Sequence, residues 1–291
     1  MRCAVLLGLM ACGSNGKEPP PPPTPKVVPD AAAVAVVDAG PPLPEHQSYP
    51  DLAAAIAATV PADTRVVGFG EIHARVDRAQ VRSALSLFTA AFPSFGERIS
   101  DLIVETWIVD PKCGQKAVET TAKVEKDVKR PEATKSEIGL LADAAKAANV
   151  QPHAMTLQCK DYEKLAPKHG QADPIAMLTL TTRELQRIAT SAVKHRDRDP
   201  KHRPWIALYG GALHNDRFPG AGVAEWSYAE TIDLATDGKY LEIDLIVPEL
   251  AEADKVSHEQ PWFPLVAAAN RVLVWKRGER SFVMILPRTK T

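Results

Sequence analysis

The sequence lacks an excess of charge of either sign: 35 Lys and Arg residues stand against 36 Asp and Glu residues, for a formal net charge of -1. No overall field therefore attracts a polyanion, and nucleic acid is not expected as a partner. Hydrophobic residues make up 45% and charged residues 24% of the 291 residues. This composition excludes a fully disordered, collagen-like or multi-span membrane chain and leaves one large folded domain or two small ones.

The first eleven residues predict an export signal. Residues 1–11 carry one positive charge followed by an apolar run that is too short for a stable membrane-spanning helix. The run Leu9–Cys12 resembles the bacterial lipobox, whose cysteine receives diacylglycerol and becomes the mature N-terminus. The resemblance implies an exported lipoprotein that is anchored through Cys12 to a bacterial membrane, in the periplasm or on the outer surface. The alternatives are a cleaved secretory signal without lipidation or a misassigned start codon.

Residues 12–47 predict a tether rich in proline and alanine. Eleven of the 25 prolines lie between Pro19 and Pro50, and five of them are consecutive. Consecutive prolines favour an extended polyproline II segment of ~3.1 Å per residue. Such a segment serves as a spacer between the membrane and a folded domain, which we expect at residues 48–291.

Strands and helices alternate along that domain. Short apolar runs predict strands at 65–70, 102–104, 150–157, 205–209 and 241–247, and a closing hairpin at 272–275 and 282–286. Helical spacing of apolar residues predicts helices at 52–60, 81–92, 134–148 and 174–193. Thr134 and Glu137 have the spacing of a capping box, and Asp173 that of an N-cap. The alternation predicts an α/β fold with a mostly parallel or mixed central sheet, helices on both faces and a C-terminal β-hairpin.

Ionisable side chains follow three of the predicted strands. Glu71 and His73 follow the first, Glu105 follows the second, and His214 follows the strand at 205–209. Because ligands of such sheets bind at the carboxyl ends of strands, we expect these four side chains to meet in one crevice. Imidazoles with carboxylates can bind a divalent metal such as zinc or manganese, or can act as general acid and base without one. The glycines beside them are expected to turn the backbone tightly or to let it approach a ligand: Gly68, Gly70, Gly210 and Gly211.

The motifs Val67–His73, Ile103–Glu105 and Tyr209–His214 are similar, in order and spacing, to the signature of one superfamily. This superfamily joins erythromycin esterases, Tiki and TraB-type metalloproteases, and ChaN haem-binding lipoproteins, and the resemblance is nearest to the ChaN and esterase branches. It covers about residues 60–287. It implies that the four ionisable side chains line a pocket that hydrolyses an ester or peptide bond, or that holds haem. The segment 112–135, rich in Lys and Glu, matches no pattern of the family and leaves the substrate open.

Three interpretations follow from this site. In the first, Glu71 or Glu105 is the general base of a hydrolase acting on a small molecule or peptide. His73 and His214 then transfer protons or, together with Glu105, bind a divalent metal. In the second, His73 and His214 ligate haem iron without turnover. In the third, the site is degenerate and the lipoprotein has a structural role.

Apart from the lipidated Cys12, Cys113 and Cys159 are the cysteines that remain after export. An even pair in an oxidising compartment predicts a disulfide, which would clip the segment 112–135 to the sheet. A nucleophilic or haem-ligating cysteine is the competing interpretation. His153 and His169 have no comparable context and are expected to be structural or on the surface.

Overall fold

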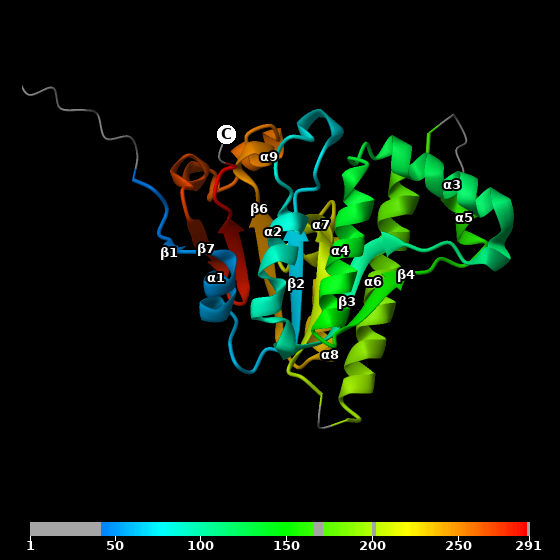
Figure 1. The fold of residues 1–291 in the computed structure, drawn as a ribbon, viewed down its shortest axis with the longest axis horizontal. Coiled ribbons are helices and arrows are strands. Elements are labelled where there is room, and N and C mark those ends of the chain that lie inside the picture. Colours follow the sequence, from blue (N-terminus) through cyan, green and yellow to red (C-terminus); the bar gives the residue numbers. More distant parts are fainter. Residues whose placement is uncertain (1–41, 166–170, 200–201, 290–291) are drawn as a thin grey trace, which may run out of the picture. The chain divides into compact units, whose positions relative to one another are not determined.

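The computed structural model describes residues 42–165, 171–199 and 202–289, which build a central eight-stranded sheet with helices on both faces (Figure 1). The predicted signal peptide, the lipidated Cys12 and most of the predicted tether lie outside the described residues. Within those residues, no helix is both long enough and apolar enough to cross a membrane.

The sheet has the strand order β1-β7-β8-β6-β2-β5-β3-β4. Its strands are β1 (Gln47–Tyr49), β2 (Val66–Glu71), β3 (Ile99–Trp107), β4 (Gln151–Met155), β5 (Trp205–Gly211), β6 (Tyr240–Ile246), β7 (Val272–Gly278) and β8 (Ser281–Ile285). The six strands from β8 to β4 in this order are parallel, whereas β7 is antiparallel to β8 and β1 is antiparallel to β7. The predicted α/β class with a C-terminal hairpin is confirmed, and β1 adds an edge strand that the sequence did not predict.

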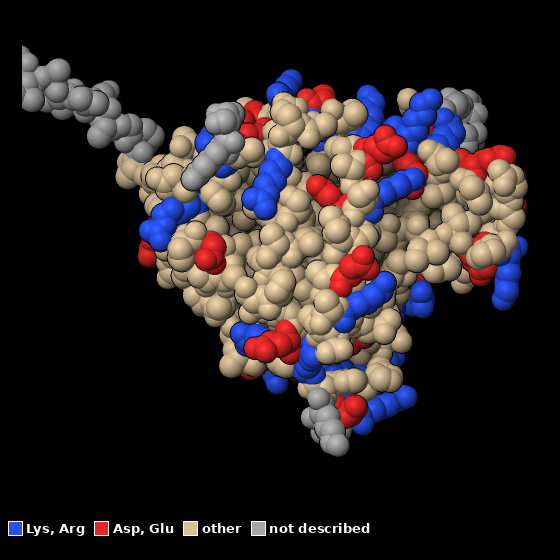
Figure 2. Space-filling model, in the orientation of Figure 1, with Lys and Arg blue, Asp and Glu red and all other residues tan. Residues whose placement is uncertain are grey.

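Helices cover the sheet on both sides. They are α1 (Leu52–Thr59), α2 (Ala84–Ala91), α3 (Gly114–Asp127), α4 (Ala133–Ala147), α5 (Asp161–Leu165), α6 (Pro174–Arg196), α7 (Ala212–Asn215), α8 (Ala229–Ala235), α9 (Pro248–Ala251) and α10 (Lys255–His258). One apolar cluster joins α1, α2 and α4 to one face, and another joins α6 and α8 to the opposite face. On the face seen in Figure 2, acidic and basic side chains are interspersed and form no large patch of one sign.

A cluster of aromatic rings forms the core under α2. The ring of Phe88 lies 4.8 Å, between centroids, from the rings of both Phe69 in β2 and Tyr209 in β5. Phe92 and Phe95 pack against Phe88 at 5.9 and 5.5 Å. Truncating a buried phenylalanine to alanine typically costs ~3–5 kcal/mol of stability. These contacts fix Tyr209, whose hydroxyl reaches beyond the core.

One predicted helix cap is wrong and another is present. Glu137 accepts a hydrogen bond from the Ser83 hydroxyl at 2.8 Å, and Thr134 makes no cap, so the capping box does not form. Ser83 in turn caps α2 by accepting from Ser86 N at 3.0 Å, so this contact between two helices displaces the local one. Asp173 caps α6 as expected, accepting from the backbone of the second and third helical residues.

Candidate functional site

The four predicted side chains line one cavity of about 680 Å³. Glu71 ends β2, His73 lies two residues further, Glu105 lies in β3, and His214 lies in α7 directly after β5. Because β2, β5 and β3 are parallel neighbours in the sheet, their carboxyl ends lie at the same edge. The opposite wall of the cavity comes from α3, the start of α4 and the start of α6.

Glycines next to the site make room for side chains and do not turn the backbone. Gly210 and Gly211 belong to β5 and have no positive φ. A Cβ atom at Gly210 would lie 2.6 Å from Glu105 Oε2, and one at Gly211 would lie 2.8 Å from His73 Nε2. The tight turn expected at Gly210 and Gly211 is therefore absent, and their missing side chains make room for Glu105 and His73. Close approach of the backbone to a ligand stays a prediction.

A chain of hydrogen bonds leads from the core to the cavity. The Tyr209 hydroxyl donates to Glu71 Oε2 at 2.6 Å, and Glu71 Oε1 lies 2.9 Å from His73 Nδ1. Burial and then the Glu71 charge hold the pKa of Tyr209 well above its ordinary value, so the hydroxyl stays protonated and donates. Glu71 is 8% exposed and the His73 side chain 33%, so the imidazole is the more solvent-exposed end of this hydrogen-bond chain. This order is that of an oriented general base.

Arg130 is a site residue that the sequence did not predict. Its Nη2 donates to Glu105 Oε1 at 3.0 Å and lies 2.7 Å from His73 Nε2. Glu105 Oε2 accepts from the backbone N–H of Gly211 at 2.6 Å. Burial alone would raise the pKa of Glu105, but His73 and Arg130 hold it well below its ordinary value. Glu105 is thus an ionised carboxylate that fixes the guanidinium beside the imidazole.

The contact with Arg130 fits one neutral tautomer of His73. A guanidinium only donates, so Nε2 accepts and the ring proton sits on Nδ1, facing Glu71. Burial and Arg130 lower the pKa of His73, but Glu105 and Glu71 together raise it above its ordinary value. These carboxylates favour a protonated ring that could no longer accept from Arg130. Proton uptake by His73 and departure of Arg130 from Nε2 are therefore coupled.

His214 is held differently from His73. Its Nδ1 lies 2.9 Å from the carbonyl oxygen of Trp226 and 2.9 Å from the Thr182 hydroxyl, and the residue is only 4% exposed. A carbonyl oxygen only accepts, so Nδ1 carries the proton and Nε2 has the lone pair. A neutral His214 in this state can accept a proton or ligate a metal but cannot donate to a leaving group through Nε2.

The arrangement bears on both cofactors that the sequence suggested. Among the described residues, no three His, Cys, Asp or Glu side chains are placed to hold a metal ion. The lone pairs of His73 Nε2 and Glu105 Oε1 both face the positive charge of Arg130, so His73, Glu105 and His214 as placed do not fit a divalent metal. For haem, His214 fits the role of an iron ligand, whereas His73 fits only if Arg130 moves away. Both cofactors stay predictions.

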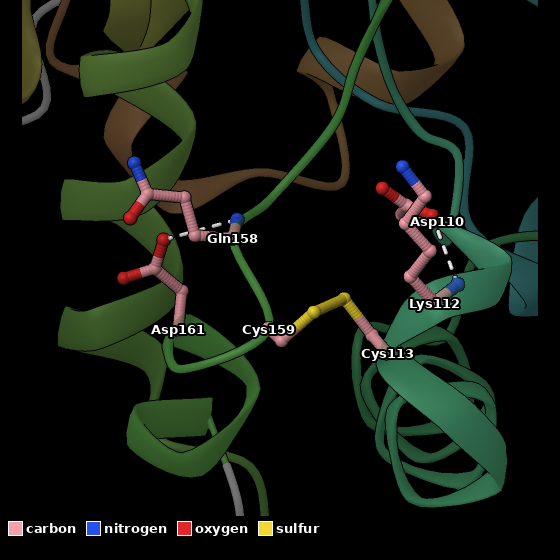
Figure 3. Close-up of a disulfide and its surroundings, with 6 residues drawn as sticks. All are labelled: Asp110, Lys112, Cys113, Gln158, Cys159 and Asp161. Atoms are coloured by element: carbon pink, nitrogen blue, oxygen red, sulfur yellow. Dashed lines mark hydrogen bonds between the residues drawn. A yellow bond between two sulfur atoms is a disulfide. The ribbon is translucent and has the colours of Figure 1, made fainter.

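Two further sequence expectations have an outcome in the structure. Cys113 and Cys159, the pair expected to be bonded, form a disulfide with an S–S distance of 2.03 Å (Figure 3). His153 lies outside the cavity and pairs with Asp101 at 2.8 Å, while His169 lies outside the described residues.

Tyr209 and Arg130, the two site residues that the sequence did not predict, differ in how far the sequence marks them out. Tyr209 stands in a quoted motif, at the carboxyl end of a buried strand, where a hydroxyl can reach the strand ends. Arg130 stands in a segment with many other cations, and nothing local distinguishes it from them.

Comparisons with known proteins give little. No protein-family model matches the chain, and no curated protein matches it. A solved structure, that of the type III effector HopBA1, matches with 11% sequence identity and a TM-score of 0.39, over 84% of this chain and 98% of that one. At that TM-score the likeness supports no argument about the site.

Proposed function

We propose that this protein is an exported, membrane-anchored lipoprotein whose domain hydrolyses a small, mainly apolar carboxylic ester. The observation that carries the proposal is the chain Tyr209–Glu71–His73, which ends in the cavity at His73 Nε2, 2.7 Å from the Arg130 guanidinium. Acyl transfer to water requires a general base that accepts a proton from the water and a positive charge that stabilises the oxyanion, and an oriented imidazole next to a fixed guanidinium can supply both.

In the proposed reaction, the substrate carbonyl oxygen takes the place of His73 as the partner of Arg130. The freed Nε2 accepts a proton from water as the water oxygen attacks the carbonyl carbon. Arg130, held by Glu105, stabilises the negative charge that develops on the carbonyl oxygen. His73 then returns its proton to the leaving alcohol oxygen, and Glu71 keeps the ring in orientation throughout. Both carboxylates are orienting groups in this scheme, because each already accepts two hydrogen bonds.

The cavity wall supports a small apolar substrate better than a peptide. Apolar side chains line the cavity together with the acid–base residues, among them Trp107, Ile138, Met155 and Met177. Ligand cavities of ~300–1,000 Å³ with apolar walls and a few polar groups suit small molecules. An extended peptide is bound chiefly through backbone hydrogen bonds, often at a sheet edge. Much of this wall consists of helix side chains and not of a sheet edge. Hydrolysis of a peptide bond is therefore tested as the alternative.

Hydrolysis of 4-nitrophenyl butyrate tests the proposal. His73→Gln should lower kcat/KM by ~10²–10⁴, the usual contribution of a general base. His153→Gln is the matched control, because His153 is also an imidazole held by a carboxylate at 2.8 Å but lies outside the cavity. Wild-type activity should be measured before and after dialysis against a chelator, which tests the predicted divalent metal. Absence of turnover on this ester and on a chromogenic peptide would contradict the proposal.

The anchor is tested separately from the reaction. Expressed in bacteria with its full N-terminus, the protein should enter the membrane fraction and incorporate a clickable palmitate analogue. Cys12→Ser should abolish both results, whereas Cys3→Ser, a second cysteine in the same leader, should leave them unchanged. Membrane association that survives Cys12→Ser would contradict lipidation at this position.

Haem binding is the second candidate function, favoured by His214. Its Nδ1 donates to a backbone carbonyl, the arrangement that orients a histidine for ligation through Nε2. Titration with haemin should then produce a shifted Soret band that His214→Ala abolishes and His153→Ala retains. A spectrum identical for wild type and His214→Ala would remove this candidate.

A further inference from the structure

We propose that Cys113 and Cys159 are positioning residues for Arg130: their disulfide holds the helical arm (residues 113–130) so that the guanidinium stays beside His73 and Glu105. The inference rests on the proposed function for its activity measurement only.

The Cys159 end of the bond is rooted in the body of the domain. Cys159 lies between β4 and α5, two residues before Asp161, which is fully buried. Asp161 accepts two hydrogen bonds from Arg183 of α6, at 3.2 and 2.6 Å, and a third from the backbone of Gln158 at 3.3 Å. As Figure 3 shows, Asp161 and Gln158 stand on the same segment as Cys159, and Cys113 approaches from the opposite side. The bond therefore ties the arm to α6 through this segment, and not to the sheet as the sequence suggested.

Besides the disulfide, the arm is held by a small apolar cluster and by Asp127, whose Oδ2 accepts from the backbone N–H of Ala172 at 2.8 Å. Of the 14 residues of α3, only Ala117, Thr120 and Val124 are buried. They pack in a small cluster with α5 and the start of α6, which meets the cluster on the α6 face of the sheet at Trp107 of β3. An ion pair between Glu125 and Lys135 links α3 to α4, but both side chains are exposed and such pairs contribute little. The disulfide is thus the strong link at the start of α3.

The far end of the arm delivers Arg130 to the site. Lys129, which follows α3, adopts a left-handed backbone with φ 53° and accepts the N–H of Val76 at 3.1 Å. The next residue is Arg130, with its two contacts to Glu105 and His73. Since α3 is a continuous helix from residue 114 to 127, a shift at Cys113 moves the whole helix and the residues that follow it. Fixing Cys113 therefore limits the positions available to the guanidinium.

Hydrogen exchange tests the mechanical part without any substrate. In Cys113→Ser/Cys159→Ser, amides of residues 114–127 and the amide of Val76 should exchange at least ~10-fold faster, while those of β2 and β5 keep their rates. The matched control Lys135→Ala, which removes only the exposed ion pair, should leave the arm unchanged. If the double variant does not fold, the folded wild type can be treated with dithiothreitol, which closes to its cyclic disulfide as the two thiols form. Unchanged exchange in the arm, or loosening that spreads through the sheet, would overturn the inference.

A cycle of variants tests the positioning of Arg130. Arg130→Gln should lower kcat on 4-nitrophenyl butyrate by ~10²–10³, the effect of losing one donor to a developing oxyanion. Cys113→Ser/Cys159→Ser should lower kcat by at least 10-fold, and combining it with Arg130→Gln should cause no further loss. Losses that multiply would mean that the bond acts through overall stability, which contradicts positioning. A wild type without ester activity would reject the proposed function, whereas the exchange result would still decide whether the bond holds the arm.

Discussion

Largely buried carboxylates stand on either side of β2 in the sheet, and their surroundings shift their pKa values in opposite directions. Toward β5 and β3 lies Glu105, whose pKa falls well below its ordinary value because His73 and Arg130 outweigh burial. Toward β6 lies Asp244, whose pKa rises well above its ordinary value through burial and then through the charges of Glu242 and Asp216. Nearby positive charge outweighs burial at Glu105 and does not at Asp244, which is why the two pKa values move apart.

Hydrogen bonds explain the same difference atom by atom. Glu105 accepts from Arg130 and from Gly211 N–H. On the β6 side the nearby cation, Arg277, pairs with Asp216 at 2.6 Å and Glu242 at 3.3 Å, and Asp244 Oδ1 has no partner. Asn215 Oδ1 is likewise unpartnered, and a Cβ at Gly70 would lie 2.4 Å from the first of these oxygens and 2.6 Å from the second. Protonation of Asp244 would let its carboxyl group donate to the unpartnered Asn215 Oδ1.

Replacing a glutamate by glutamine should impair catalysis on the Glu105 side of β2 and not on the β6 side. Glu105→Gln should lower kcat/KM on 4-nitrophenyl butyrate by ~10²–10³, because the amide no longer fixes Arg130 for the developing oxyanion. Glu242→Gln, its counterpart on the β6 side, should retain activity within a few-fold, since Glu242 does not line the cavity. Equal losses in both variants would show that the two clusters act as one site.

A smaller effect is expected from adding one methyl group beside Glu105. Gly210→Ala places a Cβ 2.6 Å from Glu105 Oε2 and 2.8 Å from Glu105 Cβ, so Glu105 must leave the position in which it accepts from Arg130. Misplacement of a catalytic group by ~1 Å costs ~10²-fold in rate, and kcat should fall by about that factor. Gly220→Ala, where nothing lies within 4 Å, is the matched control. Normal activity in Gly210→Ala would mean that the position of Glu105 is not critical.

The half of the site on the strands could be predicted from sequence because its geometry is local. Glu71, His73, Glu105 and His214 each lie at or soon after the carboxyl end of an apolar run, and parallel strands bring such ends together whatever the helices do. Arg130 could not be predicted in this way. Its place depends on an arm that packs mainly on α5 and α6 and carries a disulfide 17 residues earlier in the chain.

The alternating sequence of β6 led to a wrong expectation about its burial. Leu241, Ile243 and Leu245 alternate with polar residues, which predicts a strand with one face in water. Both faces of β6 are covered, and Glu242 is fully buried. Binary patterning assumes that a carboxylate faces solvent. It fails where Arg277 pairs with one buried acid and where another has its pKa raised far enough to favour protonation.

Replacing Asp244 by its neutral isostere should stabilise the protein in a pH-dependent manner. An acid whose pKa is raised on folding binds its proton more tightly in the native state, so rising pH disfavours the native state above the unfolded-state pKa of ~4. Asp244→Asn removes this penalty and keeps a donor for Asn215. The variant should match wild type near pH 4 and exceed its unfolding free energy by on the order of 1 kcal/mol at pH 7.

Urea unfolding of both proteins at pH 4, 5.5, 7 and 8.5 measures this difference. The exposed Asp143→Asn should show no such trend, because Asp143 has a side chain that is 74% exposed and is paired only with Lys146. Activity of Asp244→Asn should equal that of wild type, since Asp244 does not line the cavity. A variant less stable than wild type at neutral pH would mean that Asp244 is ionised in the native state. The two sides of β2 would then differ in their partners but not in their charge.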